Sequence, residues 1–559
     1  MTSSAPGAAA ADNDSAWWRS AVIYQIYPRS FADSNGDGMG DLPGITDKLE
    51  YLAELGVDAV WLSPFYASPQ ADAGYDVADY RDIDPTFGTL ADADALIERA
   101  HGLGLRVIVD LVPNHTSDEH EWFPAAIAAG PNSLERNRYH FRDGRGADGD
   151  QPPNNWKSVF GGPAWERITE PDGSPGQWYL HLFDVKQPDL NWENPQVREE
   201  FHAILRFWLD RGVDGFRVDV AHGLVKAEGL PDSKTGDDPD LLHGDHDPFE
   251  REPFWDQDGV HEIYRGWNAV LSEYSGDRMM VAEAWVQPAE RLALYLRHDE
   301  FHQAFNFPYL ESRWSPTVQR SVIASSLAAD AVVGSPTTWV LSNHDVVRHR
   351  TRLALPADAG RPNGIGPDDP QPDQELGLRR ARAATLMMLA LPGSAYVYQG
   401  EELGLPEHTT LPDEARQDPT FFRHHGTVKG RDGCRVPMPW RSGEPGLGFG
   451  PSDKTWLPQP ASYAQLAADA QDGQDGSTLE LYRAALRLRR EYRLGLGDLH
   501  WRDEFGPEVV AFDRAPVSSL TNFGATAVDL PEGARVVLAS GDLVDGKVGQ
   551  DQTVWFTRD

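Results

Sequence analysis

The chain has 559 residues, which is long enough for a large catalytic domain with smaller additions. Its 87 acidic residues outnumber 50 basic ones and give a formal net charge of −37, which repels nucleic acid and anionic lipid headgroups. We therefore expect no nucleic-acid or membrane partner, and a small neutral or cationic ligand. Hydrophobic residues make up 40% of the chain, too many for a disordered protein, so we interpret the excess acid as a solvated shell.

The single cysteine, Cys434, excludes an intramolecular disulfide and a cysteine-based zinc site, and it fits a reducing compartment. Residues 1–16 are small and acidic, with neither a basic start nor a leucine-rich stretch, so we expect a disordered tail rather than a secretory signal. No window approaches the roughly 18 apolar residues of a membrane span. These features predict a cytoplasmic protein, as a monomer or homodimer.

Short β-branched runs alternate with amphipathic stretches from Trp17 onward. This part of the chain predicts, in order, a strand at Val22–Tyr27, a helix at Ile45–Leu55, a strand at Val57–Leu62, a helix at Leu90–Leu103 and a strand at Leu105–Val112. The βαβαβ order indicates parallel strands. Residues 113–187 are rich in Gly, Pro, Asn and Trp and interrupt the rhythm, which indicates an inserted domain.

The alternation resumes after this insertion and continues to about Leu494. It predicts helices at Val197–Leu209 and Glu375–Leu391, strands at Val213–Val220, Met279–Trp285, Thr338–Ser342 and Ala395–Gln399, and a long loop at Pro231–Pro253. Helical patterns then cease. The last segment predicts short strands at Val509–Asp513, Thr521–Phe523, Ala534–Ala539 and Thr553–Phe556.

These elements predict an α/β fold built on an eight-stranded parallel barrel, the (β/α)8 or TIM barrel. The barrel would comprise residues 17–112 and 188–494, with domain B inserted at 113–187 after the third strand. Residues 495–559 would form an antiparallel β-sandwich domain. A doubly wound sheet is the alternative, because periodicity alone cannot show that the sheet closes.

In such barrels reactive groups come from the carboxyl ends of different strands. Charged and histidine side chains follow several predicted strands here: Asp110 and His115, Arg217 and Asp219, Glu283, and His344 with Asp345. The alternation within GFRVDV sends Arg217 and Asp219 to the same face. One such residue alone is more often a solvated loop residue, but their convergence on one barrel mouth predicts a catalytic pocket.

Two or three carboxylates around one pocket suit glycoside cleavage. A retaining enzyme needs an ionised nucleophile and a protonated acid about 5–5.5 Å apart. We expect Arg217 to lower the pKa of Asp219, and the apolar neighbours of Glu283 to keep that residue protonated. Asp345 would then hold sugar hydroxyls and stabilise a positively charged transition state.

Four segments, DLVPNH, GFRVDVAH, VAEAW and LSNHD, resemble the signature regions of the α-amylase superfamily, glycoside hydrolase family 13. QPDLNW at Gln187–Trp192 resembles the additional motif of its oligo-1,6-glucosidase and α-glucosidase branch, as do WWRSAVIYQIYPRSFADSNGDGMGDLPGI and KGRDGCRVPMPW. The resemblance runs from Trp17 to the last residue. It implies Asp219 as nucleophile, Glu283 as acid/base and Asp345 as transition-state stabiliser.

The resemblance also implies a sugar pocket lined by Tyr75, His115, Phe183, Arg217 and His344, with Phe160 and Gln187 nearby. Asp72 and Arg431 would pair at its floor, bind the outermost hydroxyls of a non-reducing-end glucose and make the action exo. Val220, after the nucleophile, matches members that accept α-1,6 bonds. The next residues, AHG, differ from the usual α-1,6 pattern, so both linkages are expected.

The segment Asp33–Asp41 places oxygen-bearing side chains at alternate positions, as a hard cation prefers. It begins like an EF-hand loop, but Gly44 stands where that motif has its bidentate Glu. The resemblance implies a structural Ca²⁺ or Mg²⁺ bound by the side chains of Asp33, Asn35, Asp37 and Asp41 and the carbonyl of Met39. A polar turn without a metal is the alternative.

We therefore expect an exo-acting, retaining α-glucosidase that cleaves short neutral α-glucosides with α-1,4 or α-1,6 linkages, without an organic cofactor. An α-transglucosylase or sucrose isomerase using the same site is the alternative. The segment ESRWSPTVQR does not match the loop expected of an isomerase, but transglucosylation is expected as a side reaction. A noncatalytic binding protein is disfavoured, because the carboxylates are present.

Overall fold

A computed structural model describes residues 16–234, 251–356, 359–360 and 362–558. The predicted tail at 1–16 lies outside these residues except for Ala16, and so does most of the loop predicted at Pro231–Pro253. Within the described part of the chain, no helix is long and apolar enough to cross a membrane.

The centre of the described chain is an eight-stranded, entirely parallel sheet. Its strands are β1 (Val22–Ile26), β2 (Ala59–Leu62), β5 (Arg106–Leu111), β9 (Gly215–Val218), β10 (Met279–Ala282), β11 (Gln303–Ala304), β12 (Thr338–Val340) and β13 (Ser394–Tyr398). In space they follow the order β12-β13-β1-β2-β5-β9-β10-β11, so that chain order continues around the sheet.

This order decides between the two architectures that the sequence allowed. A doubly wound sheet reverses its strand order at a switch point, whereas here the two edge strands, β11 and β12, are consecutive in the chain. The Tyr396 hydroxyl donates to the Gln303 side chain at 2.7 Å and so links β13 to β11. The sheet is a nearly closed TIM barrel, as the sequence predicts.

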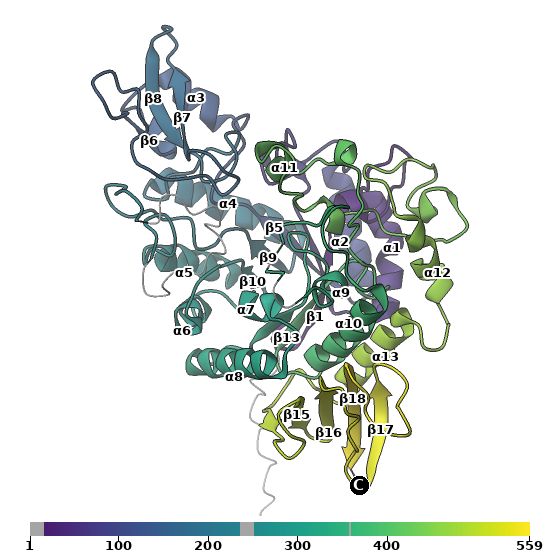
Figure 1. The fold of residues 1–559 in the computed structure, drawn as a ribbon. Helices are drawn as coiled ribbons and strands as arrows, with labels where there is room; N and C mark the ends of the chain where they lie inside the picture. The colour runs from purple at the N-terminus through teal and green to yellow at the C-terminus, as the bar shows by residue number, and fades with distance from the viewer. Residues whose placement is uncertain (1–15, 235–250, 357–358, 361, 559) are drawn as a thin grey trace, which may run out of the picture.

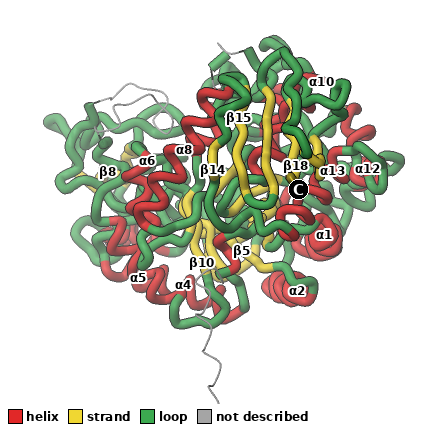
Figure 2. Tube along the Cα trace, turned by 90° about the horizontal axis from the view of Figure 1, so that it is seen from below, coloured by secondary structure: helices red, strands yellow, loops and turns green. Residues whose placement is uncertain are grey.

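Helices surround the strands (Figures 1 and 2). The longer ones are α1 (Leu42–Leu55), α2 (Leu90–Gly102), α4 (Pro195–Arg211), α5 (Val260–Leu271), α8 (Pro316–Val333), α10 (Gln374–Leu389) and α13 (Thr478–Glu491). The shorter ones are α3 (Trp122–Ala129), α6 (Ala289–Leu292), α7 (Phe307–Glu311), α9 (His349–Arg352), α11 (Pro419–Arg423) and α12 (Ala468–Gln471). Side-chain caps explain where two of these helices begin. The Asp41 carboxylate accepts from Gly44 N at the start of α1, and Thr89 with Asp92 forms a capping box at the start of α2.

Two strands that lead to the site end earlier than their patterns predict. The sequence predicts strands to Val220 and Trp285, but the ladders of β9 and β10 stop at Val218 and Ala282. The chain leaves the ladder there, and Val220 adopts a φ of 44°, which is unusual for a β-branched residue. Strand β11 has only two residues and no recognisable pattern, so the sequence did not predict it.

Alternation along the strands divides the core into two layers. The inner layer fills the barrel and includes Ile23, Trp61 and Ile108, whereas Phe216 and Val218 join the outer layer beneath the helices. Because successive side chains point to opposite faces, Arg217 and Asp219 face the barrel interior, as predicted. A Cβ on Gly215 would lie 2.5 Å from the Met279 carbonyl oxygen, so the approach of β9 to β10 requires glycine there.

Between β5 and α4 the chain forms a small three-stranded antiparallel sheet, which projects from the barrel (Figure 1). Its strands are β6 (Phe141–Arg142), β7 (Trp165–Thr169) and β8 (Pro175–Leu180), in the order β6-β8-β7. A two-stranded antiparallel ribbon, β3 (Tyr66–Ala67) and β4 (Asp79–Ile83), lies after β2.

The C-terminal segment forms one five-stranded antiparallel sheet in the order β14-β15-β16-β18-β17. Its strands are β14 (His500–Trp501), β15 (Val509–Arg514), β16 (Val517–Asn522), β17 (Ala534–Ala539) and β18 (Gln552–Arg558). The predicted antiparallel C-terminal β domain is therefore confirmed, as one sheet within the described residues. Helix α10 covers one face of this sheet: Trp555 and Thr553 donate to the carbonyls of Leu386 and Ala383.

Candidate active site

A pocket of about 300 Å³ lies where the carboxyl ends of the barrel strands meet. Ten of the residues proposed from the sequence line it: Asp72, Tyr75, His115, Phe160, Phe183, Asp219, Val220, Glu283, Asp345 and Arg431. They come from segments up to about 360 positions apart in the chain, and only the closing of the barrel brings them together.

Strand register places the four charged groups nearest the centre. Arg217 on β9 is level with Asp110 on β5 and with Val281 on β10. Glu283 lies two residues beyond Val281, and Asp219 two residues beyond Arg217, so all project toward the same interior space. The register therefore sets an arginine among three carboxyl groups.

Arg217 binds each of these carboxyl groups. Its Nη1 donates to Asp219 Oδ1 at 2.7 Å and to Asp110 Oδ1 at 3.0 Å, and its Nη2 donates to Glu283 Oε2 at 2.7 Å. The Arg217 side chain is only 3% exposed. One buried positive charge does not balance three neighbouring negative ones, so this arrangement favours binding of a proton by the cluster.

The pKa values of two carboxyl groups reflect this imbalance. Burial raises the pKa of Asp219, the charges of Glu283 and Asp110 raise it further, and Arg217 opposes both. The net direction is upward, so the expectation that Arg217 would leave Asp219 with a lowered pKa is wrong, although the contact itself is present. Burial also raises the pKa of Asp110 to about 7 against the opposing charge of Arg217.

Glu283 has a more polar setting than its apolar neighbours in the sequence suggest. Its Oε2 accepts from Arg217 and from Val220 N at 3.1 Å, and its Oε1 accepts from Trp285 Nε1 at 3.2 Å. The setting of Glu283 therefore combines a charged donor, a backbone donor and an indole donor, and both of its carboxyl oxygens are engaged.

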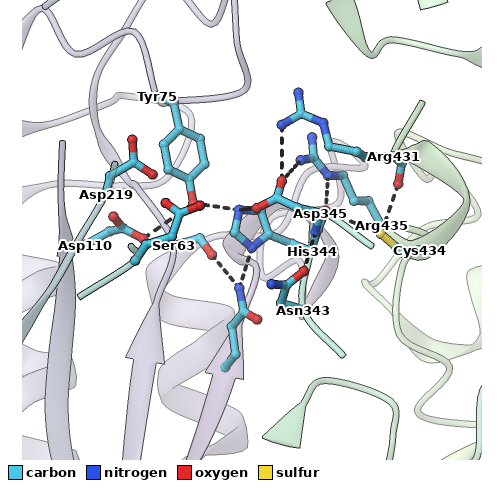
Figure 3. Close-up of polar contacts among 12 residues, drawn as sticks. Ser63, Tyr75, Asp110, Asp219, Asn343, His344, Asp345, Arg431, Cys434 and Arg435 are labelled. Atoms are coloured by element: carbon cyan, nitrogen blue, oxygen red, sulfur yellow. Dashed lines mark hydrogen bonds and ion pairs between the residues drawn. The ribbon is translucent and has the colours of Figure 1, made fainter. Parts of the chain in front are cut away.

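Asp345 has the opposite electrostatic setting. Its Oδ1 accepts from Arg431 Nη1 at 3.1 Å and from Arg435 Nη2 at 2.9 Å, and His344 Nε2 lies 3.1 Å from its Oδ2. Burial opposes ionisation, but His344 and the two arginines outweigh it and lower the pKa of Asp345 well below its usual range. Figure 3 shows both arginines on the side of Asp345 away from Asp219 and Asp110.

His344 is neutral, because burial lowers its pKa well below the usual range. Gln25 Nε2 donates to its Nδ1 at 2.6 Å, so the single ring proton lies on Nε2, 2.6 Å from the Tyr75 hydroxyl. The Tyr75 and His344 rings also stack, with an interplanar angle of 2°. These contacts fix the side chain of Tyr75 in the pocket wall (Figure 3).

The predicted floor pair is in contact. Arg431 Nη2 donates to Asp72 Oδ1 at 2.9 Å, and its Nε donates to Asp418 Oδ2 at 2.7 Å. The guanidinium also lies 5.5 Å from the centroid of the Phe160 ring. Burial raises the pKa of Asp72 to about 6, against the opposing charge of Arg431.

Two residues expected in the lining, Arg217 and His344, lie behind it, as does Gln187, which was expected nearby. Arg217 binds the carboxyl groups, and His344 contacts the Tyr75 hydroxyl. Gln187 is fully buried. Gln187 Nε2 donates to Asp72 Oδ2 at 3.3 Å and lies 3.1 Å from His115 Nε2. Gln187 therefore positions lining residues and does not itself line the pocket. Burial lowers the pKa of His115 to about 4, so that ring is neutral as well.

The sequence reasoning missed part of the lining. These residues are Val159, His222, Trp285, Val346, Val347, Arg352, Pro362, Asn363, Thr420, His424 and Val428. Trp285 and Val346 could have been found, because they closely follow Glu283 and Asp345. Thr420, His424 and Val428 come from α11 and the loop after it, where no periodic pattern marks a pocket residue.

The Asp33–Asp41 loop uses its oxygens in hydrogen bonds to its own backbone. Asp33 Oδ1 accepts from Gly36 N at 2.7 Å, and Asp41 Oδ2 accepts from Ser34 N at 3.1 Å. Across the described residues, no three His, Cys, Asp or Glu side chains gather as a metal site would require. A cation in this loop would therefore need the Asn35 amide and the Met39 carbonyl to complete its ligands.

A parallel barrel with three carboxyl groups at the carboxyl ends of its strands defines a class of barrel enzymes. Residues 25–496 match the family model for the alpha amylase catalytic domain. The chain belongs to this family, glycoside hydrolase family 13, and is a glycoside hydrolase.

Relatives and solved structures agree with this membership. The chain is 40% identical to a probable alpha-glucosidase of Rhizobium meliloti, over 85% of this chain and 83% of that one. It is 36% identical to the oligo-1,6-glucosidase of Parageobacillus thermoglucosidasius, over 87% and 86%. Among solved structures it is similar to the alpha-glucosyl transfer enzyme XgtA, with a TM-score of 0.83 and 37% identity over 98% of this chain and all of that one. It also resembles the trehalulose synthase MutB of Pseudomonas mesoacidophila, with a TM-score of 0.80 and 31% identity over 99% and 100%.

The raised pKa of Asp110 predicts how stability depends on pH. Its ordinary value is 3.8 and its value in the fold is about 7, so the folded state binds a proton that the unfolded state has lost. This contribution is complete at low pH and is lost as pH rises from about 4 through 7. Asp110→Asn mimics the protonated acid and should therefore be more stable relative to wild type at pH 8 than at pH 5.

Urea unfolding of both proteins at pH 5 and pH 8 measures this difference. The matched control is Asp172→Asn, because Asp172 is fully exposed and a hydrogen bond from Ser174 lowers its pKa, so it titrates below the tested range. The control should keep the wild-type pH dependence. A difference between Asp110→Asn and wild type that is the same at both pH values would contradict the assignment of the proton to Asp110.

Proposed function

We propose that this glycoside hydrolase is an exo-acting, retaining α-glucosidase that releases glucose from the non-reducing end of short α-glucosides. The observation that carries the proposal is the carboxyl pair Asp219 and Glu283, which Arg217 holds together at the pocket. The relatives named alpha-glucosidase and oligo-1,6-glucosidase support the substrate class. The net charge of −37 supports a neutral sugar rather than an anionic substrate.

The proposed reaction divides the work among three carboxyl groups. Asp219 attacks the anomeric carbon while Glu283 gives its proton to the leaving oxygen, so the glycosidic bond breaks as an ester bond forms. Water then attacks the same carbon and gives a proton to Glu283, and the ester bond breaks. Asp345 remains ionised beside the two arginines and stabilises the positively charged transition state.

The proton arrangement supports these roles. Asp219 must be ionised to attack, although burial and the neighbouring acids raise its pKa. Protonation of Asp110, whose pKa is about 7, frees the charge of Arg217 for Asp219. We therefore assign Asp110 a positioning role, in which it adjusts the charge of the cluster without contacting the sugar.

The floor supports exo action on both linkages. Arg431 holds Asp72, Asp418 and Asp345, so ion pairs stand beyond the end of the pocket that would receive the non-reducing glucose. Val220 also lines the pocket, and its hydrocarbon side chain cannot form a linkage-specific hydrogen bond. We expect cleavage of α-1,4 and α-1,6 bonds.

An α-transglucosylase or sucrose isomerase with the same site is the second candidate. The similarity to XgtA and MutB favours it, because their names state glucosyl transfer and trehalulose synthesis. Both functions share the glucosyl-enzyme intermediate and differ only in whether water or a sugar hydroxyl attacks it. We further propose a reducing compartment such as the cytoplasm, which the single buried Cys434 supports, and a monomer or homodimer.

Anomer-resolved NMR of the products from maltose, isomaltose, sucrose and soluble starch separates these candidates. We expect the short sugars to release α-glucose first and starch to remain nearly intact, because the floor admits only one chain end. New oligosaccharides with little free glucose would identify transfer as the principal activity. β-Glucose as the first product would contradict retention.

Substitutions of the carboxyl pair test the assigned roles. Asp219→Asn should reduce hydrolysis at least about a thousandfold, because no ester intermediate can form. Glu283→Gln should reduce maltose hydrolysis about a hundredfold or more, but should affect the first step on p-nitrophenyl α-glucoside far less, since that leaving group needs no proton. Steady-state and burst kinetics measure both effects.

Asp94→Asn is the control for these variants, since Asp94 pairs with Arg211 at the surface and lies outside the pocket. It should retain wild-type rates on both substrates. Equal losses on maltose and the aryl glucoside in Glu283→Gln would remove the acid role from Glu283. Residual maltose hydrolysis well above a thousandth in Asp219→Asn would argue against the nucleophile.

We also propose that the loop from Asp33 to Asp41 holds a structural Ca²⁺ or Mg²⁺. Two observations support it: Asp33 and Asp41 are 5% and 3% exposed, and among the described residues neither forms an ion pair with a basic side chain. Burial raises the pKa of Asp41, and the nearby charge of Asp33 adds to it. A bound cation would relieve this repulsion and, far from the pocket carboxylates, would stabilise the loop before α1.

Chelation tests the cation. EDTA should lower the Tm of the wild type by several degrees, and added Ca²⁺ should restore it, because a ligand of the folded state stabilises that state. Asp41→Asn keeps a good cap for α1 but loses the charge, so its Tm should not respond to EDTA. Elemental analysis that finds no divalent metal, together with a wild-type Tm insensitive to EDTA, would rule the cation out.

A further inference from the structure

The sequence contains two Asn-Gly pairs, Asn35-Gly36 and Asn363-Gly364. An Asn-Gly pair favours deamidation, because glycine has no side chain to keep its backbone nitrogen away from the preceding side-chain amide. Both asparagines are exposed to solvent, so exposure alone does not separate them. The two pairs differ in the hydrogen bonds of the atoms that would react.

The reacting atoms of the first pair are held in place. Gly36 N donates to Asp33 Oδ1 at 2.7 Å, and the side-chain oxygen of Asn35 accepts from Asp37 N at 2.9 Å. The Gly36 nitrogen can attack only after it leaves the Asp33 carboxylate, and that negative charge also opposes the loss of its proton. The fold therefore protects Asn35 from deamidation.

The second pair lacks this protection. Across the part of the chain that the structure describes, neither Gly364 N nor the side-chain amide of Asn363 forms a hydrogen bond. The main-chain oxygen of Asn363 accepts from Gly430 N at 3.0 Å, but that oxygen takes no part in the attack. The nitrogen of Gly364 and the side-chain amide of Asn363 are therefore free to approach one another.

Packing requires glycine at position 364. A Cβ there would lie 2.2 Å from the Gly430 carbonyl oxygen, and Gly364 has a φ of 81°, in the left-handed region. A larger residue after Asn363 would slow deamidation by shielding the backbone nitrogen, but it would not fit against Gly430. The structure therefore keeps a reactive pair at this position.

This pair lies beside the pocket. Asn363 lines it together with the polar side chains of His222, Thr420 and His424. Gly430, which donates to the Asn363 carbonyl, directly precedes Arg431, and Arg431 binds Asp72 and Asp345. A change in the main chain at position 363 therefore reaches the floor arginine through one hydrogen bond.

We propose that Asn363 is a site of spontaneous deamidation in the folded protein and that its isoaspartyl product inactivates the enzyme. The Gly364 nitrogen gives its proton to water or hydroxide and forms a bond to Asn363 Cγ, while the Cγ–Nδ2 bond breaks and ammonia leaves. Water then opens the resulting succinimide at one of its two carbonyls. The products are an aspartyl and an isoaspartyl residue, each with a new negative charge.

The isoaspartyl product changes the main chain itself. It adds one carbon to the main chain before Gly364, and the carbonyl that accepts from Gly430 N becomes a carboxylate. The space beside Gly364 has no room for a Cβ, so the added carbon must displace Gly430 and, with it, Arg431. Because a misplacement of about 1 Å can cost about a hundredfold in rate, modified chains should be nearly inactive.

Peptide mapping by mass spectrometry tests the site without reference to activity. The enzyme is incubated at pH 8 and digested, and protein isoaspartyl methyltransferase marks the isoaspartyl residues. The peptide with Asn363 should become modified at least about tenfold faster than the peptide with Asn35, where a hydrogen bond to a carboxylate must break first. In urea both peptides should react at similar rates.

Two results would overturn the site. One is equal rates for the two pairs in the folded protein, which would show that the hydrogen bonds do not decide the reaction. The other is an Asn363 that reacts in urea but stays unmodified in the folded protein.

Activity measurements test the inactivation. The rate on p-nitrophenyl α-glucoside should fall in proportion to the isoaspartyl fraction at position 363. Asn363→Gln cannot close the five-membered ring, so this variant should keep its own starting rate through the incubation. The matched control, Asn35→Gln, should lose activity with time as the wild type does. Isoaspartate that accumulates at position 363 without loss of rate would overturn the inactivation.

Only the activity measurement rests on the proposed function. Absence of p-nitrophenol release before any incubation would overturn that function, and the inactivation with it, while the mapping result would still decide the modification site.

Discussion

The site depends on one buried charge, the guanidinium of Arg217, which binds Asp110, Asp219 and Glu283 within the barrel. Its place follows from strand register, because Arg217 is level with Asp110 on β5 and with Val281 on β10. A buried arginine is stable only when its hydrogen bonds are satisfied. The carboxyl groups are therefore as necessary to the arginine as the arginine is to them, and the closed barrel holds all four in place.

The pocket is divided into two regions with different protonation. Around Arg217 the acids outnumber the base, and burial raises the pKa values of Asp110 and Asp219. Around Asp345, two arginines and His344 lower the pKa of the single acid. The first region therefore favours a bound proton, and the second favours an ionised carboxylate. The proposed acid catalysis needs the former, and the proposed stabilisation of a cationic transition state needs the latter.

Much of the fold and of the candidate site could be predicted from local patterns. Side chains alternate between the two faces of a strand, which predicted Arg217 and Asp219 on the same face. Reactive groups follow the carboxyl ends of barrel strands, which predicted that the carboxylates lie close together. What depends on distant elements could not be predicted: α10 covers one face of the C-terminal sheet, and α11 contributes Thr420 to the pocket. The direction of the pKa shift of Asp219 could not be predicted. The sequence shows that Arg217 lies two residues away, but it does not show how deeply the Asp219 carboxyl group is buried.

The barrel supplies partners to its charged groups in two ways. Inside the sheet, strand register aligns them, as Asp110 on β5 and Arg217 on β9 pair with one another. Beyond the strands no ladder exists, and loops bring the partners instead, as Arg431 and Arg435 reach Asp345. The charges inside the sheet therefore follow from local alternation along the strands, whereas those at the floor of the pocket depend on segments far apart in the chain, such as Asp72 and Arg431.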